Sequence, residues 1–230
     1  MNSIVLSVVL PSYEEEENLN NLIPDIQEVL KSMKVSNEII VIDTEKKIDK
    51  TQEVCNKYKC KYVSRVGGNS YGNAIRTGID RSKGSFLLFM DADGSHDPKF
   101  IPDLYRHIDN YDVVVASRYI DKGDTENNFI STLMSKTLNV TYSLILGIPC
   151  KDISNSFKIY HRNQLCDIEL TCNNFDIVEE IMFKLNRQVP DFKIKEIPFV
   201  FKRRALGKTK RNLFLFILTY AYTIIKLRLK

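Results

Sequence analysis

The sequence predicts an α/β domain with a mainly parallel central sheet and helices on both faces. Three observations predict this fold. Short runs rich in Val and Ile recur along the chain, segments of helical length and period separate them, and polar residues follow the runs. The 230 residues are enough for one domain with a sizeable core. Because ligands of such sheets bind beyond the carboxyl ends of the strands, these polar residues are the candidate functional residues.

The first half of the chain alternates strands and helices as this fold requires. The expected strands cover residues 4–10, 38–43, 61–66, 85–91 and 112–117. The helices expected between the first four strands cover residues 16–33, 50–59 and 71–83. Asp97 and Pro98 fit the N-cap and the first position of the next helix.

The second half has longer helical segments. It is expected to contain a helix over residues 128–147, a strand over 155–161, a helix over 175–188 and a strand over 192–202. The last segment, 211–230, has an apolar core of about 13 residues, whereas a helix needs about 20 to span a bilayer. It predicts a helix that either lies in a membrane interface or packs on its own domain or in a dimer.

The net charge of +4 is concentrated near the end of the chain, in "KRRALGKTKR" (202–211) and "KLRLK" (226–230). Such clusters suit phosphates, a membrane surface or nucleic acid. Nucleic-acid binding would predict aromatic residues among the basic ones and no acidic metal pair, and neither holds. We therefore expect no nucleic-acid partner.

The cysteines and the first residues indicate a cytoplasmic protein. The five cysteines are odd in number and form no C-x-x-C pair, so neither a zinc site nor a disulfide framework is predicted. The opening "MNSIVLSVVLPSY" has no basic region before its apolar run, and it therefore reads as a first strand rather than a signal peptide.

The most informative motif follows the strand at 85–91, where Asp91 and Asp93 flank Ala92. Two carboxylates one residue apart at a strand end can bind one hard cation such as Mg²⁺ or Mn²⁺. Taken alone, this pattern is more often a polar turn, for which Asp and Gly are the usual residues. Its meaning therefore depends on the other motifs in the chain.

Five segments together resemble the dolichol-phosphate mannose synthases and their relatives in glycosyltransferase family 2. In order along the chain they are "VVLPSYEEEENLNNLI", "DADGSHDPKFIPDL", "ASRY", "DISNSFKIYHR" and "EIPFVFKRRALGKTK". The resemblance covers about residues 4–211, and five matches in order are more specific than any one of them. It implies a GT-A fold, a glycosyltransferase domain over 1–211 followed by the helix at 212–230, a nucleotide-sugar donor and a divalent cation.

The resemblance also implies roles for individual residues. Those that would frame the nucleotide are Pro11, Tyr13, Glu15, Asp43 and Ala92. Asp91 and Asp93 resemble the metal and diphosphate ligands, and Ser95 falls where some relatives carry a third metal-site side chain. The residues that would hold the phosphates are Arg118, Arg204 and Lys210.

Three positions leave questions open. Thr44 stands where the family usually has a second acid after the second strand, so the donor base is in question and a nucleotide other than that of GDP-mannose is allowed. Glu180 matches an acid that faces the acceptor, and it is either a general base or a helix-surface residue. His96 is either a group near the metal or a turn residue.

The function implied is an inverting, metal-dependent glycosyltransferase. It would move a sugar from a nucleotide-diphosphate sugar, such as GDP-mannose, to a polyprenyl phosphate at the cytoplasmic face of a membrane. The alternative is a family 2 enzyme that acts on a hydroxyl of a lipid-linked or polysaccharide glycan, which would need Glu180 or a neighbour as base. The sequence leaves open whether a membrane-anchoring partner or a homodimer is involved.

Overall fold

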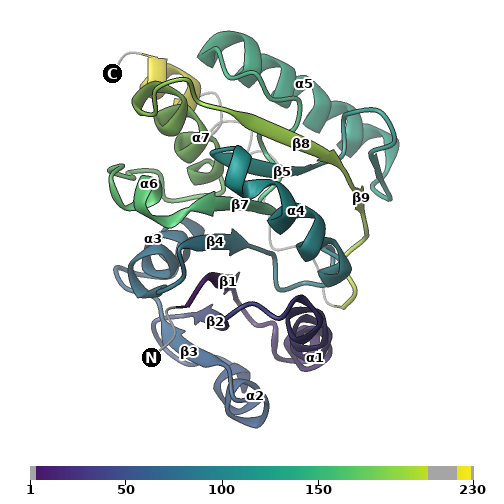
Figure 1. The fold of residues 1–230 in the computed structure, drawn as a ribbon, viewed down its shortest axis with the longest axis vertical. Helices are drawn as coiled ribbons and strands as arrows, with labels where there is room; N and C mark the ends of the chain where they lie inside the picture. The colour runs from purple at the N-terminus through teal and green to yellow at the C-terminus, as the bar shows by residue number, and fades with distance from the viewer. Residues whose placement is uncertain (1–3, 207–221, 229–230) are drawn as a thin grey trace.

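A seven-stranded sheet forms the centre of the protein, seen in a computed structural model that describes residues 4–206 and 222–228 (Figure 1). Its strand order is β3-β2-β1-β4-β7-β5-β8. The bounds are β1 Leu6–Pro11, β2 Asn37–Asp43, β3 Lys61–Ser64, β4 Phe86–Phe89, β5 Val113–Ser117, β7 Lys158–His161 and β8 Ile194–Pro198. Only β7 runs antiparallel to its two neighbours, so the expected mainly parallel sheet is confirmed.

The helices cover both faces of this sheet, as the alternating pattern predicts. Their bounds are α1 Glu16–Met33, α2 Thr51–Tyr58, α3 Tyr71–Arg81, α4 Ile101–His107, α5 Phe129–Leu146, α6 Arg162–Cys166 and α7 Ile177–Gln188. One apolar cluster joins a sheet face to α1, α2 and α4, and a second joins the other face to α3, α5, α6 and α7. A small two-stranded sheet, β6 (Asp124–Thr125) with β9 (Val200–Phe201), lies beside the main one.

The central strand β1 is buried along its whole length, which is typical of a parallel strand covered on both faces. Its side chains alternate between the two clusters, with Val8 in one and Val9 in the other. On the Val9 side, α3 lies so close that a Cβ added to Gly78 would be 2.6 Å from Val9 Cγ1. This close approach fixes the distance between α3 and β1.

The second half of the sequence predicts the structure less completely. The strand expected over 155–161 is only four residues long, because residues 151–156 form a loop that leads into β7. The expected helix start at Asp97 is confirmed, since its side chain accepts the Lys99 N–H at 3.0 Å and begins a 3₁₀ turn that continues into α4.

The described end of the chain, residues 222–228, is helical and packs on the domain. Leu227 is buried in the α7 cluster, and the Thr223 hydroxyl donates to Asp176 Oδ2 at 2.5 Å. Ile225 on the same turn is 58% exposed. Of the expected helix over 212–230, residues 212–221 and 229–230 lie outside the described residues, as does Lys210. Among the helices that the structure describes, none is long and apolar enough to cross a membrane.

Candidate active site

The candidate site lies at the carboxyl ends of β1, β2, β4 and β5, where the sequence places it. Asp91 follows β4, and its carboxylate is held from two directions. The Ser156 hydroxyl donates to Asp91 Oδ1 at 2.9 Å, and the Tyr71 hydroxyl, at the start of α3, lies 3.4 Å from the same oxygen. Burial raises the pKa of Asp91, and the nearby charge of Asp93 adds to this rise. A cation at this position would favour the ionised carboxylate.

His96 lies behind Asp91 and is completely buried, so the interpretation as a simple turn residue is wrong. Its ring stacks on Phe157 with centroids 4.7 Å apart. Nδ1 accepts the backbone N–H of Asp91 at 3.0 Å, which leaves the proton of the neutral ring on Nε2, 3.9 Å from Asp91 Oδ2. Because burial lowers the pKa of His96, the ring is neutral at pH 7.

Asp93 is oriented by its own turn. Its Oδ1 accepts both the amide of Ser95 at 3.0 Å and the Ser95 hydroxyl at 2.6 Å. Ser95 therefore supports Asp93 in this structure, and its predicted role as a metal-site side chain stays a prediction. Ala92, between the two acids, is buried.

A segment from far along the chain closes over this turn and brings three predicted residues together. Arg204 Nη2 lies 2.5 Å from Glu15 Oε1, and Arg204 Nη1 lies 3.5 Å from Asp93 Oδ2. The backbone follows the same path, since the amide of Ala205 donates to the carbonyl of Asp93 at 3.0 Å. Gly94 permits this approach, because a Cβ there would lie 2.9 Å from that of Ala205. Glu15, Asp93 and Arg204 thus form one cluster.

The predicted nucleotide side of the site is at the ends of β1 and β2. Pro11 ends β1, and Tyr13 beyond it is exposed. Asp43 is buried, which raises its pKa, and its Oδ2 accepts the Tyr62 hydroxyl at 3.1 Å. Thr44 donates to the carbonyl of Lys46 at 2.6 Å, so this position closes a turn instead of supplying a carboxylate.

Arg65 is a structurally important residue here that no sequence motif indicates. Its buried guanidinium donates to the backbone carbonyls of Ser12, Asp43, Asn69 and Ser70. It therefore ties the ends of β1 and β2 to the start of α3. No motif surrounds it, and a single Arg in "VSRVGG" carries no signal of burial.

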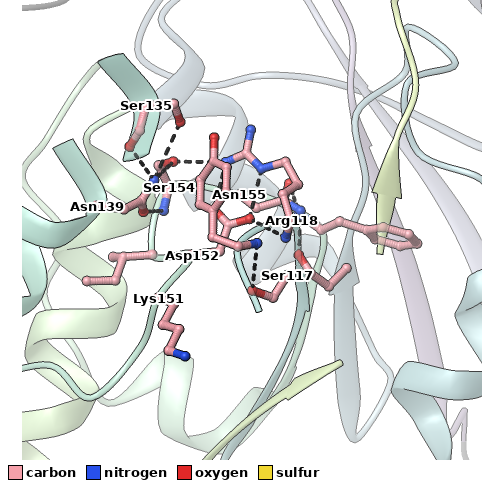
Figure 2. A network of polar contacts seen from close by, with 12 residues as sticks. Ser117, Arg118, Ser135, Asn139, Lys151, Asp152, Ser154 and Asn155 are labelled. Atoms are coloured by element: carbon pink, nitrogen blue, oxygen red, sulfur yellow. Dashed lines mark hydrogen bonds and ion pairs between the residues drawn. The ribbon is translucent and has the colours of Figure 1, made fainter. Parts of the chain in front are cut away.

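Arg118, after β5, is held by a carboxylate that we did not predict. Asp152 binds it in a bidentate manner, at 2.8 Å from Nε and 2.6 Å from Nη2, and both side chains are largely buried (Figure 2). The guanidinium also stacks on the rings of Tyr119 and Phe201. The structure thus places Arg118 beside the loop of residues 151–156.

Glu180 on α7 is not a helix-surface residue, so that interpretation is wrong, and its role as a general base stays a prediction. It is completely buried, and its oxygens accept the amides of Thr171 at 2.9 Å and Cys172 at 2.7 Å. Lys184 Nζ lies 3.0 Å away. Burial alone would raise the pKa of Glu180, but the Cys172 amide, Lys184 and Thr171 outweigh it and lower the pKa. Such a carboxylate supports a loop and is a poor proton acceptor.

The comparisons with known proteins agree with this geometry. Residues 7–167 match the family model described as glycosyl transferase family 2. The chain is 32% identical over 212 residues to a dolichol-phosphate mannosyltransferase of Pyrococcus furiosus, covering 89% of this chain but only 58% of that protein. It is 27% identical to a polyprenol monophosphomannose synthase of Mycolicibacterium smegmatis, covering 89% of this chain and 80% of that one.

Solved structures with the same fold carry nucleotides and metals. Glucosyl-3-phosphoglycerate synthase from Mycobacterium tuberculosis, in complex with Mn²⁺, UDP and its product, has a TM-score of 0.73 at 19% identity, covering 97% of this chain and 78% of that one. A complex of the same enzyme with Mg²⁺ and UDP has a TM-score of 0.72. At this identity the likeness is one of fold, and it confirms the predicted GT-A fold.

Proposed function

The chain belongs to glycosyl transferase family 2, and on that premise we propose that it transfers a sugar from a nucleotide-diphosphate sugar to a polyprenyl phosphate, with inversion. Both named relatives are mannose transferases of this kind, which makes mannose the first sugar to test. The observation that carries the proposal is that Asp91 and the Asp93–Arg204 ion pair lie at the same carboxyl edge of the sheet. Acids for a cation and an arginine for a phosphate belong together in a diphosphate site.

The donor set suits a divalent cation. Asp91 and Asp93 offer hard carboxylate oxygens at one strand end, and a cation would offset both the burial and the charge of Asp93 that raise the pKa of Asp91. Mg²⁺ or Mn²⁺ bound there would stabilise the negative charge that gathers on the leaving nucleoside diphosphate. Arg204, which reaches Asp93 now, is placed to hold the same diphosphate, and Glu15 orients it.

The state of Glu180 favours a phosphate over a hydroxyl as acceptor. A phosphate oxygen is already anionic, so it can attack the anomeric carbon as the bond to the donor diphosphate breaks, without a base. A hydroxyl acceptor would need a carboxylate able to take its proton. Glu180 has its oxygens engaged by amides, a hydroxyl and Lys184, so it does not fit that task.

We further propose that the protein meets its lipid acceptor at the cytoplasmic face of a membrane, with α5 against the lipid. Five apolar side chains of this helix are each more than half exposed: Phe129, Ile130, Leu133, Val140 and Leu144. The helix lies at the same end of the molecule as residues 222–228, which include Lys226 and Arg228 (Figure 1). Apolar side chains next to basic clusters suit an interface with anionic headgroups.

The acceptor is tested by mass spectrometry of products from a panel of nucleotide sugars, each offered with a polyprenyl phosphate or a hydroxyl-bearing glycolipid. A glycosyl phosphoryl polyprenol is expected, and a product formed only on the hydroxyl would overturn the proposal. For the membrane, liposome flotation of a Phe129→Ser, Leu144→Ser double variant should be weaker than that of the wild type. Ile48→Ser, at a half-exposed apolar residue in the loop before α2, is the control and should float normally.

A further inference from the structure

The loop of residues 151–156, between α5 and β7, reaches two candidate site residues at once. At one end, Asp152 binds the guanidinium of Arg118 at 2.6 and 2.8 Å. At the other, the Ser156 hydroxyl donates to Asp91 Oδ1 at 2.9 Å. Whatever fixes this loop therefore fixes the orientation of both side chains.

Asn139 of α5 forms hydrogen bonds with Ser154 in the middle of this loop (Figure 2). Its Oδ1 accepts the amide of Ser154 at 2.9 Å, and its Nδ2 donates to the Ser154 hydroxyl at 2.9 Å. The same Nδ2 donates to the carbonyl of Ser135 at 2.8 Å, one turn earlier in the helix. The side chain is 1% exposed, so its hydrogen bonds are made within the protein. A buried amide satisfied in this way has a single orientation.

Two other groups, the partly buried Glu196 and the buried Lys158, hold the loop through its backbone. Glu196 of β8 accepts the amides of Lys151 and Asp152, at 2.9 and 3.0 Å. Lys158 of β7 donates to carbonyl oxygens on the loop, one of them that of Ile153 at 2.8 Å. Ser154 differs, because its hydroxyl also accepts Arg118 Nη2 at 3.1 Å. A chain of contacts thus runs from Asn139 through Ser154 to Arg118.

We propose that Asn139 is a positioning residue for Arg118. Asp152 fixes one edge of the guanidinium, and Ser154 adds a contact on Nη2 that is possible only while Asn139 holds the serine in place. Because α5 also carries the exposed apolar side chains, Asn139 connects the proposed lipid-facing helix with the arginine. An effect of Asn139 on catalysis rests on the proposed function, in which Arg118 contacts a phosphate. The positioning of Arg118 by Asn139 does not depend on that function.

The positioning is tested by NMR of the arginine guanidinium N–H groups, with Nη2–H of Arg118 as the reporter because Ser154 contacts that nitrogen. The Arg118 signal is assigned by its loss in Arg118→Lys. In Asn139→Leu, which removes the amide at similar volume, the signal should shift and its hydrogen exchange should accelerate about tenfold, the effect of one charge-assisted hydrogen bond. Thr137→Val is the control, because this exposed threonine of α5 donates only to the carbonyl of Leu133, at 3.0 Å. Ser154→Ala, at a partly exposed site, replaces Asn139→Leu if that variant fails to fold.

Kinetics separate this proposal from the proposed function. Asn139→Leu should raise the KM for the donor or for the phosphate acceptor, whichever Arg118 contacts, about tenfold. In the Arg118→Lys background the same substitution should not raise that KM further, whereas a purely structural defect would raise it in both backgrounds. An Arg118 signal unchanged in Asn139→Leu overturns the positioning. If that signal moves but Arg118→Lys keeps wild-type kinetics, the positioning of Arg118 by Asn139 is supported and the proposed contact of Arg118 with a phosphate is wrong.

Discussion

Replacing Glu180 by Gln should destabilise the protein at neutral pH while sparing the chemistry of the folded enzyme. The glutamate is completely buried and accepts the amides of Thr171 and Cys172, the Thr171 hydroxyl and Lys184. A glutamine keeps one oxygen acceptor but turns an NH₂ group toward donors. About two charge-assisted hydrogen bonds are then lost, each worth roughly 1.5 kcal/mol or more. A loss of about 3 kcal/mol corresponds to a fall in Tm of roughly 6–12 °C for a domain of this size.

The same substitution should make stability less dependent on pH. The pKa of Glu180 is lowered from its ordinary value of 4.5, despite the opposing effect of burial. A carboxylate with a depressed pKa in the folded state contributes stability that is present above its unfolded pKa and is lost as pH falls through the folded one. The difference in Tm between wild type and Glu180→Gln should therefore be largest at pH 6–7 and shrink below about pH 4.5.

These effects are measured by thermal unfolding of wild type and Glu180→Gln at several pH values from 7 to 3.5. Steady-state kinetics are measured at pH 7, at a temperature below the Tm of both proteins. The matched control is Glu53→Gln on α2, an exposed acid, which should change stability by less than about 0.5 kcal/mol. An unchanged Tm with a kcat reduced more than a hundredfold would refute the reasoning, because it would mean that Glu180 acts as a base.

Four further substitutions test the carboxyl edge of the sheet. Asp93→Asn, and similarly Asp91→Asn, should abolish Mn²⁺ binding measured by EPR with the circular dichroism unchanged; full activity of either variant in EDTA would contradict the metal assignment. Arg204→Ala should raise the KM for the donor about tenfold with little change in Tm, because its ion pairs are partly exposed, and wild-type kinetics at low donor would argue against a phosphate contact. Gly94→Ala should cost about 1 kcal/mol or more, since φ is +79° and the new methyl would meet Ala205; a wild-type Tm would contradict that contact.

The local pattern of the sequence predicts the elements around the site well. Helix α1 has the bounds expected from its period, and β1 and β2 end where polar residues begin. From those ends, the rule for parallel sheets places Asp43 and Asp91 at one edge. These features depend on periodicity and on strand ends, and both can be read from neighbouring residues.

The partners of the charged side chains could not be predicted in the same way. Arg118 and Asp152 are 34 residues apart, and their pairing depends on how β5 and the 151–156 loop meet in space. Glu180 misled the prediction for a related reason. A charged residue in an amphipathic helix is expected on the exposed face, but Glu180 of α7 is buried, because Thr171 and Cys172 of the preceding loop cover it.

The buried charges share one property that links the fold to the site. Arg65, Lys158 and Glu180 each bond to the backbone of a loop, although burying a charge costs several kcal/mol and a well-packed apolar residue would often be more stable. The loop that Arg65 binds leads into Tyr71, whose hydroxyl lies near Asp91. The loop that Glu180 binds continues to Phe175, and the ring of Phe175 stacks on Tyr71. The loop that Lys158 binds carries Ser156, whose hydroxyl donates to Asp91. All three therefore act on the surroundings of the same carboxylate. A metal ligand must be held within about half an ångström to work, so, under the metal role that we propose for Asp91, these charges are better explained by the precision of its position than by the stability of the domain.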